Sequence, residues 1–106
     1  MVTNKPATQR FAALADDTRR RILEQVSVEP VPVHRLAASF DISRPAVSRH
    51  LRILREAGWV EMRTVGRENV YRLRTEPVRE LEGWLHGLWS HRLATLKDLA
   101  EESEHE

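Results

Sequence analysis

The sequence predicts a mainly α-helical fold of the α+β class that carries one small β-hairpin, and three observations support this prediction. Apolar residues recur every three or four positions along most of the chain, as they do in amphipathic helices. The period changes to strict alternation only at about 59–74, and alternation is typical of paired strands. The length of 106 residues, 41% of them hydrophobic, suits one domain spanning 1–106.

Two helices are predicted before the first proline-rich break. The first spans about 9–15 and the second about 17–28, and either Asp16 or Asp17 is placed to cap the second helix. The first helix is expected to bury Phe11, Leu14 and Ala15. In the second, the apolar residues Ile22, Leu23 and Val26 have helical spacing. The segment 29–32 has proline at two of its four positions and therefore ends the second helix.

A helix-turn-helix unit is predicted at about 33–57. Its first helix occupies about 33–40 and turns three residues inward: Leu36, Ala37 and Phe40. The tight turn at 41–43 leads into a second helix, and the hydroxyl of Ser43 is placed to accept an early backbone N–H. Pro45 lies in the first turn of that helix, where its missing N–H has no helical partner to lose. Two short helices joined by so brief a turn form a helix-turn-helix.

The second helix of this unit separates two kinds of side chain. At about 100° per residue, Val47, Leu51 and Leu54 lie on one face and are expected in the core. The opposite face holds residues able to contact bases and phosphates: Arg44, Pro45, Ser48, Arg49 and Arg52. This distribution predicts a DNA recognition helix.

Some of these positions allow more than one role. Arg44 and Arg49 have the paired donors needed for bidentate contacts to guanine. Arg52 either contacts phosphate or pairs with Glu56, four residues later. His50 either packs against the protein or hydrogen-bonds to phosphate, and the sequence reveals no nucleophile or acid beside it that predicts catalysis.

The β-hairpin is predicted at about 59–74, after Gly58 ends the recognition helix. Alternation turns four residues inward: Val60 and Met62 in the first strand, and Tyr71 and Leu73 in the second. The loop at 65–69 presents Arg67 at its tip, where it either meets DNA in the minor groove or at the backbone, or is a solvated turn residue. A helix-turn-helix followed directly by such a hairpin is the winged-helix arrangement.

A long last helix is predicted at about 77–100, with Pro77 in its first turn. Its apolar stripe is wider than one side of a small domain requires, so we expect the helix to contribute to a homodimer interface. The residues expected at that interface are Phe11, Leu81, Trp84, Leu85, Leu88, Trp89 and Leu96. Gly83 and Gly87 each cost ~1 kcal/mol in a helix interior. They either admit another helix beside Trp84, from the partner or from the start of the chain, or are surface residues.

The net charge of +1 conceals an uneven distribution along the chain. Residues 44–75, which we call the basic segment, hold eight arginines against three acidic residues, a net charge of +5, whereas residues 76–106 have a net charge of −5. This layout suits a protein that presents a basic face to a polyanion and keeps an acidic end away from it. An ordinary solvated surface is the alternative explanation.

Several classes of protein are disfavoured by what the sequence lacks. There is no cysteine, which excludes disulfides, thiolate metal sites and cysteine nucleophiles. Neither a signal peptide nor an apolar run of about 18 residues is found, so we expect a cytoplasmic, nucleoid-associated protein without a membrane partner. No acid–base pair, phosphate-binding glycine loop or nucleophile motif is found, so we expect neither an enzyme nor a cofactor.

Three segments resemble the arsenic-repressor-type (ArsR/SmtB) winged helix-turn-helix regulators. They are residues 11–23 (FAALADDTRRRIL), 42–58 (ISRPAVSRHLRILREAG) and 65–73 (VGRENVYRL), and they occur in the family's order within a resemblance covering about 8–100. The resemblance implies a homodimer, built mainly through its first and last helices, that represses transcription by binding an imperfect palindrome.

The chain departs from the metal-sensing members of this family. Those members carry a cysteine pair near the start of the helix before the recognition helix, or aspartate and histidine ligands on the last helix. Here the segment 33–37 has no thiol, and His86 and His91, five residues apart, are rotated by roughly 140° and do not share a helix face. The last helix instead resembles that of non-metal-sensing members, so no metal is expected. A metal site that bridges two subunits is the alternative, and the likeness implies no particular effector.

Together these inferences favour a homodimeric, sequence-specific regulator of transcription, most simply a repressor that binds a palindromic operator in double-stranded DNA. The residues expected to contact DNA are Ser43, Arg44, Pro45, Ser48, Arg49, His50, Arg52 and Arg67. The alternative is a protein-interaction module that uses the winged helix as a scaffold, which the broad apolar last helix supports.

Overall fold

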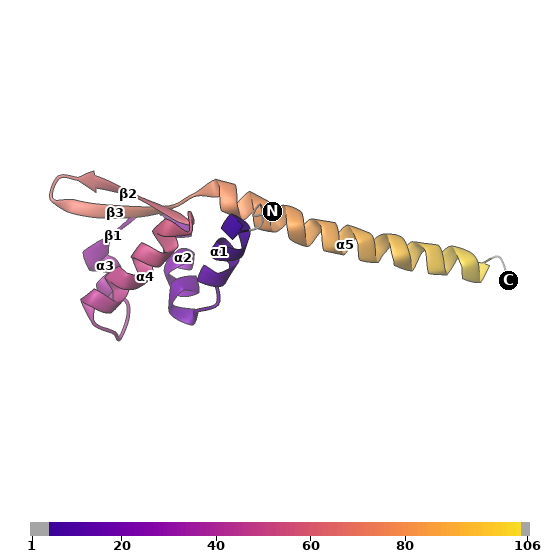
Figure 1. Cartoon of the computed structure of the whole chain (residues 1–106), viewed down its shortest axis with the longest axis horizontal. Coiled ribbons are helices and arrows are strands. Elements are labelled where there is room, and N and C mark those ends of the chain that lie inside the picture. Colours follow the sequence, from indigo (N-terminus) through magenta and orange to yellow (C-terminus); the bar gives the residue numbers. More distant parts are fainter. Residues whose placement is uncertain (1–4, 105–106) are drawn as a thin grey trace.

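A computed structural model describes residues 5–104 as a body of short elements from which one long helix projects (Figure 1). Residues 1–4 and 105–106 of the predicted domain lie outside this range. The elements are α1 (Lys5–Ala13), α2 (Asp17–Val28), β1 (Val31–Pro32), α3 (Val33–Ala38), α4 (Arg44–Glu56), β2 (Val60–Val65), β3 (Glu68–Leu73) and α5 (Thr75–Glu104). Because α5 extends well past the body, the molecule measures 70 × 33 × 23 Å.

The first two helices are confirmed, but α1 begins at Lys5, four residues before its predicted start, and the buried residue at its end differs from the expected one. Asp16 is the N-cap of α2, and its carboxylate accepts the backbone N–H of Arg19 at 3.0 Å. Helix α1 ends at Ala13 because Leu14 and Ala15 form the turn that follows. Ala13 is therefore buried, and the prediction that Ala15 is buried was wrong, since Ala15 lies beyond the helix end and is exposed.

The sheet contains one strand that the sequence pattern did not predict. Strand β1 pairs antiparallel with β3 and gives the strand order β1-β3-β2, with Val31 opposite Tyr71. A strand of two residues is too short to show alternation, and its proline is tolerated at a sheet edge. Strand β1 ties the connection between α2 and α3 to the hairpin.

The hairpin is tighter than expected. Strands β2 and β3 pair in register from Val60 opposite Leu73 to Val65 opposite Glu68, so the connection has two residues, Gly66 and Arg67, in place of the predicted loop at 65–69. Gly66 has φ +64° and no non-glycine residue of the described chain has a positive φ. A positive φ at only the first turn residue is the type II′ pattern, which requires glycine there.

The core lies between the helices of the body and the inner face of the sheet. Helix α4 supplies its centre, because Val47, Leu51 and Leu54 are all completely buried, as its period predicted. The other residues of this core are Ala13, Ile22, Val26, Val31, Leu36, Ala57, Trp59 and Val60. The indole N–H of Trp59 donates to the carbonyl of Arg10 at 2.7 Å and joins α1 to the end of α4.

Helix α5 begins two residues earlier and ends four residues later than predicted. Its first turns pack on the body through Val78 and Leu81, and the ring of Trp84 lies 6.0 Å from that of Phe11. Nothing within 4 Å meets a methyl group built on Gly83 or Gly87. The first helix therefore does not approach either glycine closely. Within residues 5–104, no helix combines the length and apolar character that crossing a membrane requires.

Candidate nucleic-acid interface

The start of α4 is built by a local cap. The hydroxyl of Ser43 accepts the backbone N–H of Ala46 at 3.2 Å, and Pro45 occupies the first turn, where no donor is lost. Because the cap fixes where the helix begins, it also fixes which side chains of the first two helical turns face solvent. This arrangement was predicted from the sequence and is confirmed.

The exposed face of α4 forms an open groove. Four residues predicted to contact DNA line it, with a volume of about 450 Å³: Pro45, Ser48, Arg49 and Arg52. All four are exposed, as are Ser43 and Arg44 at the helix start. Among the ion pairs of the described residues, none involves Arg52, so the alternative pairing of Arg52 with Glu56 is not formed. Two guanidinium groups are thus available along the groove to meet an anionic partner.

His50 lies on a different side of α4 from this groove. Its Nδ1 atom is 3.3 Å from Nη1 of Arg19 and 3.8 Å from a carboxylate oxygen of Asp16, both at the start of α2. Its side chain is 21% exposed. This placement corresponds to the packing role, and the phosphate-binding role has no support in the geometry. The sequence did not reveal the contact because it depends on how α2 packs against α4.

The pKa of Asp16 is lowered from its ordinary value. The backbone N–H of Arg19, which donates to its carboxylate, lowers the pKa of Asp16. Partial burial opposes this shift, and the charges of His50 and Arg19 add to it. The ionised cap is therefore the favoured form at neutral pH, and it anchors the turn against which His50 packs.

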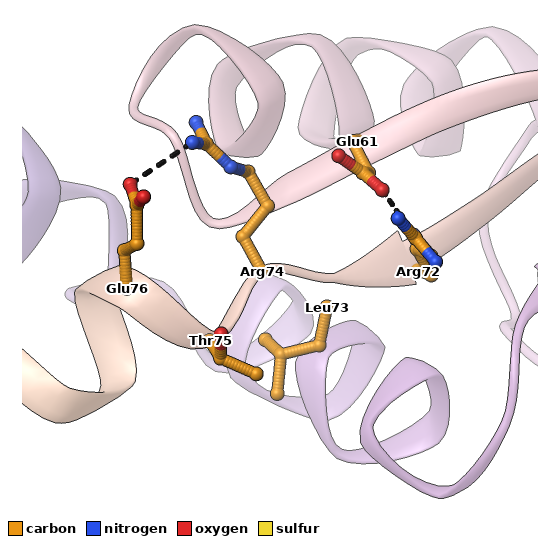
Figure 2. Close-up of a pocket in the computed structure, with 6 residues that line it drawn as sticks. All are labelled: Glu61, Arg72, Leu73, Arg74, Thr75 and Glu76. Carbon is orange, nitrogen blue, oxygen red and sulfur yellow. Dashed lines mark hydrogen bonds and ion pairs between the residues drawn. The ribbon is translucent and has the colours of Figure 1, made fainter.

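Two arginines of the basic segment are neutralised at the base of the hairpin. Figure 2 shows Arg72 facing Glu61 and Arg74 reaching toward Glu76; the second pair has a distance of 3.1 Å. These residues line an open pocket of about 350 Å³ together with Leu73 and Thr75. Because the pocket balances two arginines with two glutamates, it offers no excess charge to attract an anion.

The unpaired arginines are concentrated on α4 and the hairpin. Within the described part of the chain, six arginines of the basic segment form no ion pair: Arg44, Arg49, Arg52, Arg55, Arg63 and Arg67. Arg63 was not singled out from the sequence. It is exposed on the outer face of the hairpin, and its position in the alternating pattern was the available signal.

The hairpin is held at a defined position beside α3. The imidazole of His34 lies 3.4 Å from the carboxylate of Glu68 at the start of β3, and β1 pairs with the same strand. Arg67 is exposed in the turn. That turn and the turn between α3 and α4 both lie on the side of the body away from the C-terminal end of α5 (Figure 1).

The residues predicted at a dimer interface fall into two groups. Leu81 packs partly against the core of its own chain, and Phe11 is half-buried beside Trp84. The other predicted residues are 50–58% exposed: Trp84, Leu85, Leu88, Trp89 and Leu96. Helix α5 therefore presents a large apolar surface that its own chain does not cover.

Metal ligands are not gathered anywhere in the described range. Residues 5–104 contain no group of three or more histidine, cysteine, aspartate or glutamate side chains arranged to hold an ion. On α5, the Nε2 atom of His86 lies 3.2 Å from the hydroxyl of Ser90. His86 therefore has a hydrogen-bond partner within its own helix.

Comparison with known proteins places this geometry in a family. The profile of the bacterial regulatory proteins of the ArsR family matches residues 16–62, which run from the N-cap of α2 into β2. The chain is 38% identical over 93 residues to the HTH-type transcriptional regulator Rv2034 of Mycobacterium tuberculosis, covering 88% of this chain and 87% of that protein. It is 32% identical to the transcriptional repressor SdpR of Bacillus subtilis, covering 71% and 83%.

Solved structures agree with the sequence relatives. An ArsR-like transcriptional regulator from Rhodococcus sp. RHA1 superposes with a TM-score of 0.76 at 34% identity, covering 94% of each chain. Its match extends over the helices, the hairpin and most of α5, so the likeness is not limited to the helix-turn-helix. The chain belongs to the ArsR family of winged helix-turn-helix transcriptional regulators.

Proposed function

We propose that this protein is a homodimeric repressor that binds a palindromic operator and places α4 of each subunit in a major groove. The observation that carries the proposal is the division of α4 into two faces. One face is completely buried, and the other lines an open groove with Pro45, Ser48, Arg49 and Arg52. An α-helix fits the major groove, and arginine is the side chain best suited to the guanine edge exposed there.

The hairpin supplies the second part of the proposed contact. Arg67 in its turn and Arg63 on its outer face are exposed and form no ion pair within residues 5–104. Because wings reach the DNA backbone or an adjacent minor groove, these arginines are suited to phosphate contacts that fix the position of α4 without reading sequence.

A homodimer follows from the uncovered surface of α5. Monomeric proteins rarely leave a long apolar stripe in water, and a second copy of the same helix covers it by symmetry. Two α4 helices related by a two-fold axis then read two half-sites in opposite directions, which is a palindrome. The name of the similar SdpR as a transcriptional repressor supports repression as the outcome of binding.

Selection of bound sequences from a pool of random duplex DNA tests this proposal. We expect a palindrome with half-sites about one helical turn apart. The mass of the protein–DNA complex, measured by light scattering, is expected to correspond to two chains on one duplex. Failure to enrich any sequence contradicts the proposed operator binding.

A protein-interaction module is the second candidate, and only the apolar surface of α5 favours it. Salt titration of binding to the selected duplex separates the candidates, because neutralised phosphates make the affinity fall steeply with salt concentration. A pure interaction module shows no preferred sequence and little dependence on salt.

A further inference from the structure

Arg92 interrupts the apolar stripe of α5. Leu88 precedes it by four residues and Leu96 follows it by four, so both lie beside it on the helix surface. Leu85 and Leu99 lie seven residues away, two turns before and after it, on the same line of that surface. An exposed charge thus stands in the middle of the surface that the proposed dimer buries.

Arg92 has no carboxylate of its own helix within reach. The residues three and four positions away are Leu88, Trp89, Thr95 and Leu96, none of which is acidic. Over the range 5–104, Arg92 also takes part in no ion pair. A guanidinium that becomes buried without a charged partner opposes association, so a partner has to come from the other subunit.

The first half of α5 offers one suitable carboxylate. Glu76 is held by Arg74 at 3.1 Å, and Glu80 pairs with Arg10. Glu82 is exposed and forms no ion pair in the described part of the molecule. It lies seven residues before Trp89, so it shares that residue's flank of the apolar stripe.

Antiparallel packing of two α5 helices brings these two groups together. A register that sets Leu85 opposite Leu88 of a second copy also sets Arg92 opposite Leu81, next to Glu82 in the chain. A two-fold axis repeats each contact, so the pair between Arg92 and Glu82 forms twice. Parallel packing sets Arg92 against its own copy, which places two like charges in an apolar contact.

We propose, on the basis of the homodimer proposed above, that Arg92 pairs with Glu82 of the second copy and selects the antiparallel register of α5. A charged residue at a core position of paired helices specifies orientation at some expense in stability. The antiparallel arrangement also covers the projecting half of one α5 with the half of the other that lies near its body (Figure 1). The pair thereby fixes the separation of the two α4 helices.

Charge reversal tests the pair, with dimer dissociation measured by sedimentation equilibrium. Arg92→Glu alone and Glu82→Arg alone each place like charges together twice and are expected to weaken the dimer at least tenfold. An equimolar mixture of the two variants restores both pairs in a heterodimer, which is expected to regain most of the wild-type affinity. Lys97→Glu is the matched control: it makes the same charge change as Arg92→Glu on the other face of α5, and little effect is expected.

Each contrary result has a distinct meaning. A dimeric wild type whose two variants are not rescued by mixing overturns the pair and leaves the homodimer standing. Preferential association of Arg92→Glu with the wild type overturns the antiparallel register, because parallel packing sets these two positions together. A wild type that stays monomeric overturns the proposed homodimer and the pair with it. Circular dichroism of each variant verifies that the helices are retained.

Discussion

Helices α4 and α5 are both amphipathic, but only α4 has its apolar face covered by its own chain. Val47, Leu51 and Leu54 of α4 are completely buried, Ile53 is partly buried against the same core, and the exposed surface of the helix is mainly polar and basic. The apolar residues in the projecting part of α5 remain about half exposed, although they form a longer stripe. The difference supports the two proposed contacts: the polar, basic surface of α4 suits a polyanion, and the exposed apolar stripe of α5 suits another apolar surface.

The largest expected effect is on folding stability, when a buried apolar residue of α4 is compared with an exposed one of α5. Leu51→Ala removes a completely buried side chain of α4 and is expected to cost about 2–5 kcal/mol of unfolding free energy. Leu88→Ala, at a position 54% exposed on α5, is expected to cost much less in a dilute monomer. Urea denaturation of both variants at low protein concentration measures the difference.

The same two variants also separate their roles at high protein concentration. Wild-type stability is expected to rise with concentration because association stabilises the folded chain, and Leu88→Ala is expected to reduce this rise. Leu51→Ala is expected to retain it. Equal monomer costs for the two substitutions contradict the view that α5 is uncovered.

A smaller effect is expected at the polar face of α4. Arg49→Ala is expected to weaken binding to the selected operator by about 1–3 kcal/mol and binding to random duplex by much less, because a bidentate contact to guanine is lost. Arg55→Ala is the matched control, since Arg55 is exposed on α4 but does not line the groove. Fluorescence anisotropy with both duplexes measures the two affinities. An equal loss of affinity for the operator and for random duplex contradicts base reading and indicates that Arg49 contacts phosphate only.

The features predictable from sequence were those with local causes. Helix α4 was placed correctly because Ser43, Pro45 and the spacing of its apolar residues all lie within the helix or next to it. The end of α1 was misplaced by two residues because a turn at Leu14 carries no distinctive residue. Strand β1 was missed because its partner, Tyr71, is forty positions away and two residues give no period.

Some residues predicted to lie together at the site are separated by tertiary contacts, which helical spacing does not reveal. His50 was grouped with the arginines expected to contact DNA, yet it packs against Arg19 and Asp16, which are more than thirty residues away. Whether an arginine of the basic segment is free also depends on register, since Arg72 meets Glu61 only because the two are cross-strand partners. Charge counting therefore overestimates the basic surface.

Asp16, which caps α2 and lies near His50 of α4, is expected to contribute about 1 kcal/mol to the stability of the folded chain. Asp16→Asn keeps a capping oxygen, whereas Asp16→Ala removes it and is expected to cost ~0.5–2 kcal/mol of stability. Because the folded pKa of Asp16 is lowered from its ordinary 3.8, the charge contributes stability above that value and loses it as pH falls through the folded pKa. Urea denaturation between neutral pH and acid is expected to show the advantage of wild type over Asp16→Asn fading only in acid.

The smallest effect on DNA binding is expected at the hairpin turn. It distinguishes a phosphate contact by the hairpin from sequence reading by α4. Arg67 is exposed and projects from a two-residue turn, so a phosphate contact there adds affinity without reading bases. Arg67→Ala is expected to weaken operator and random duplex by similar factors and to lower the salt dependence of binding by about one phosphate contact. Salt-titrated anisotropy on both duplexes measures this slope. A loss confined to the operator contradicts the assignment, because it makes the hairpin, and not α4 alone, a reader of sequence.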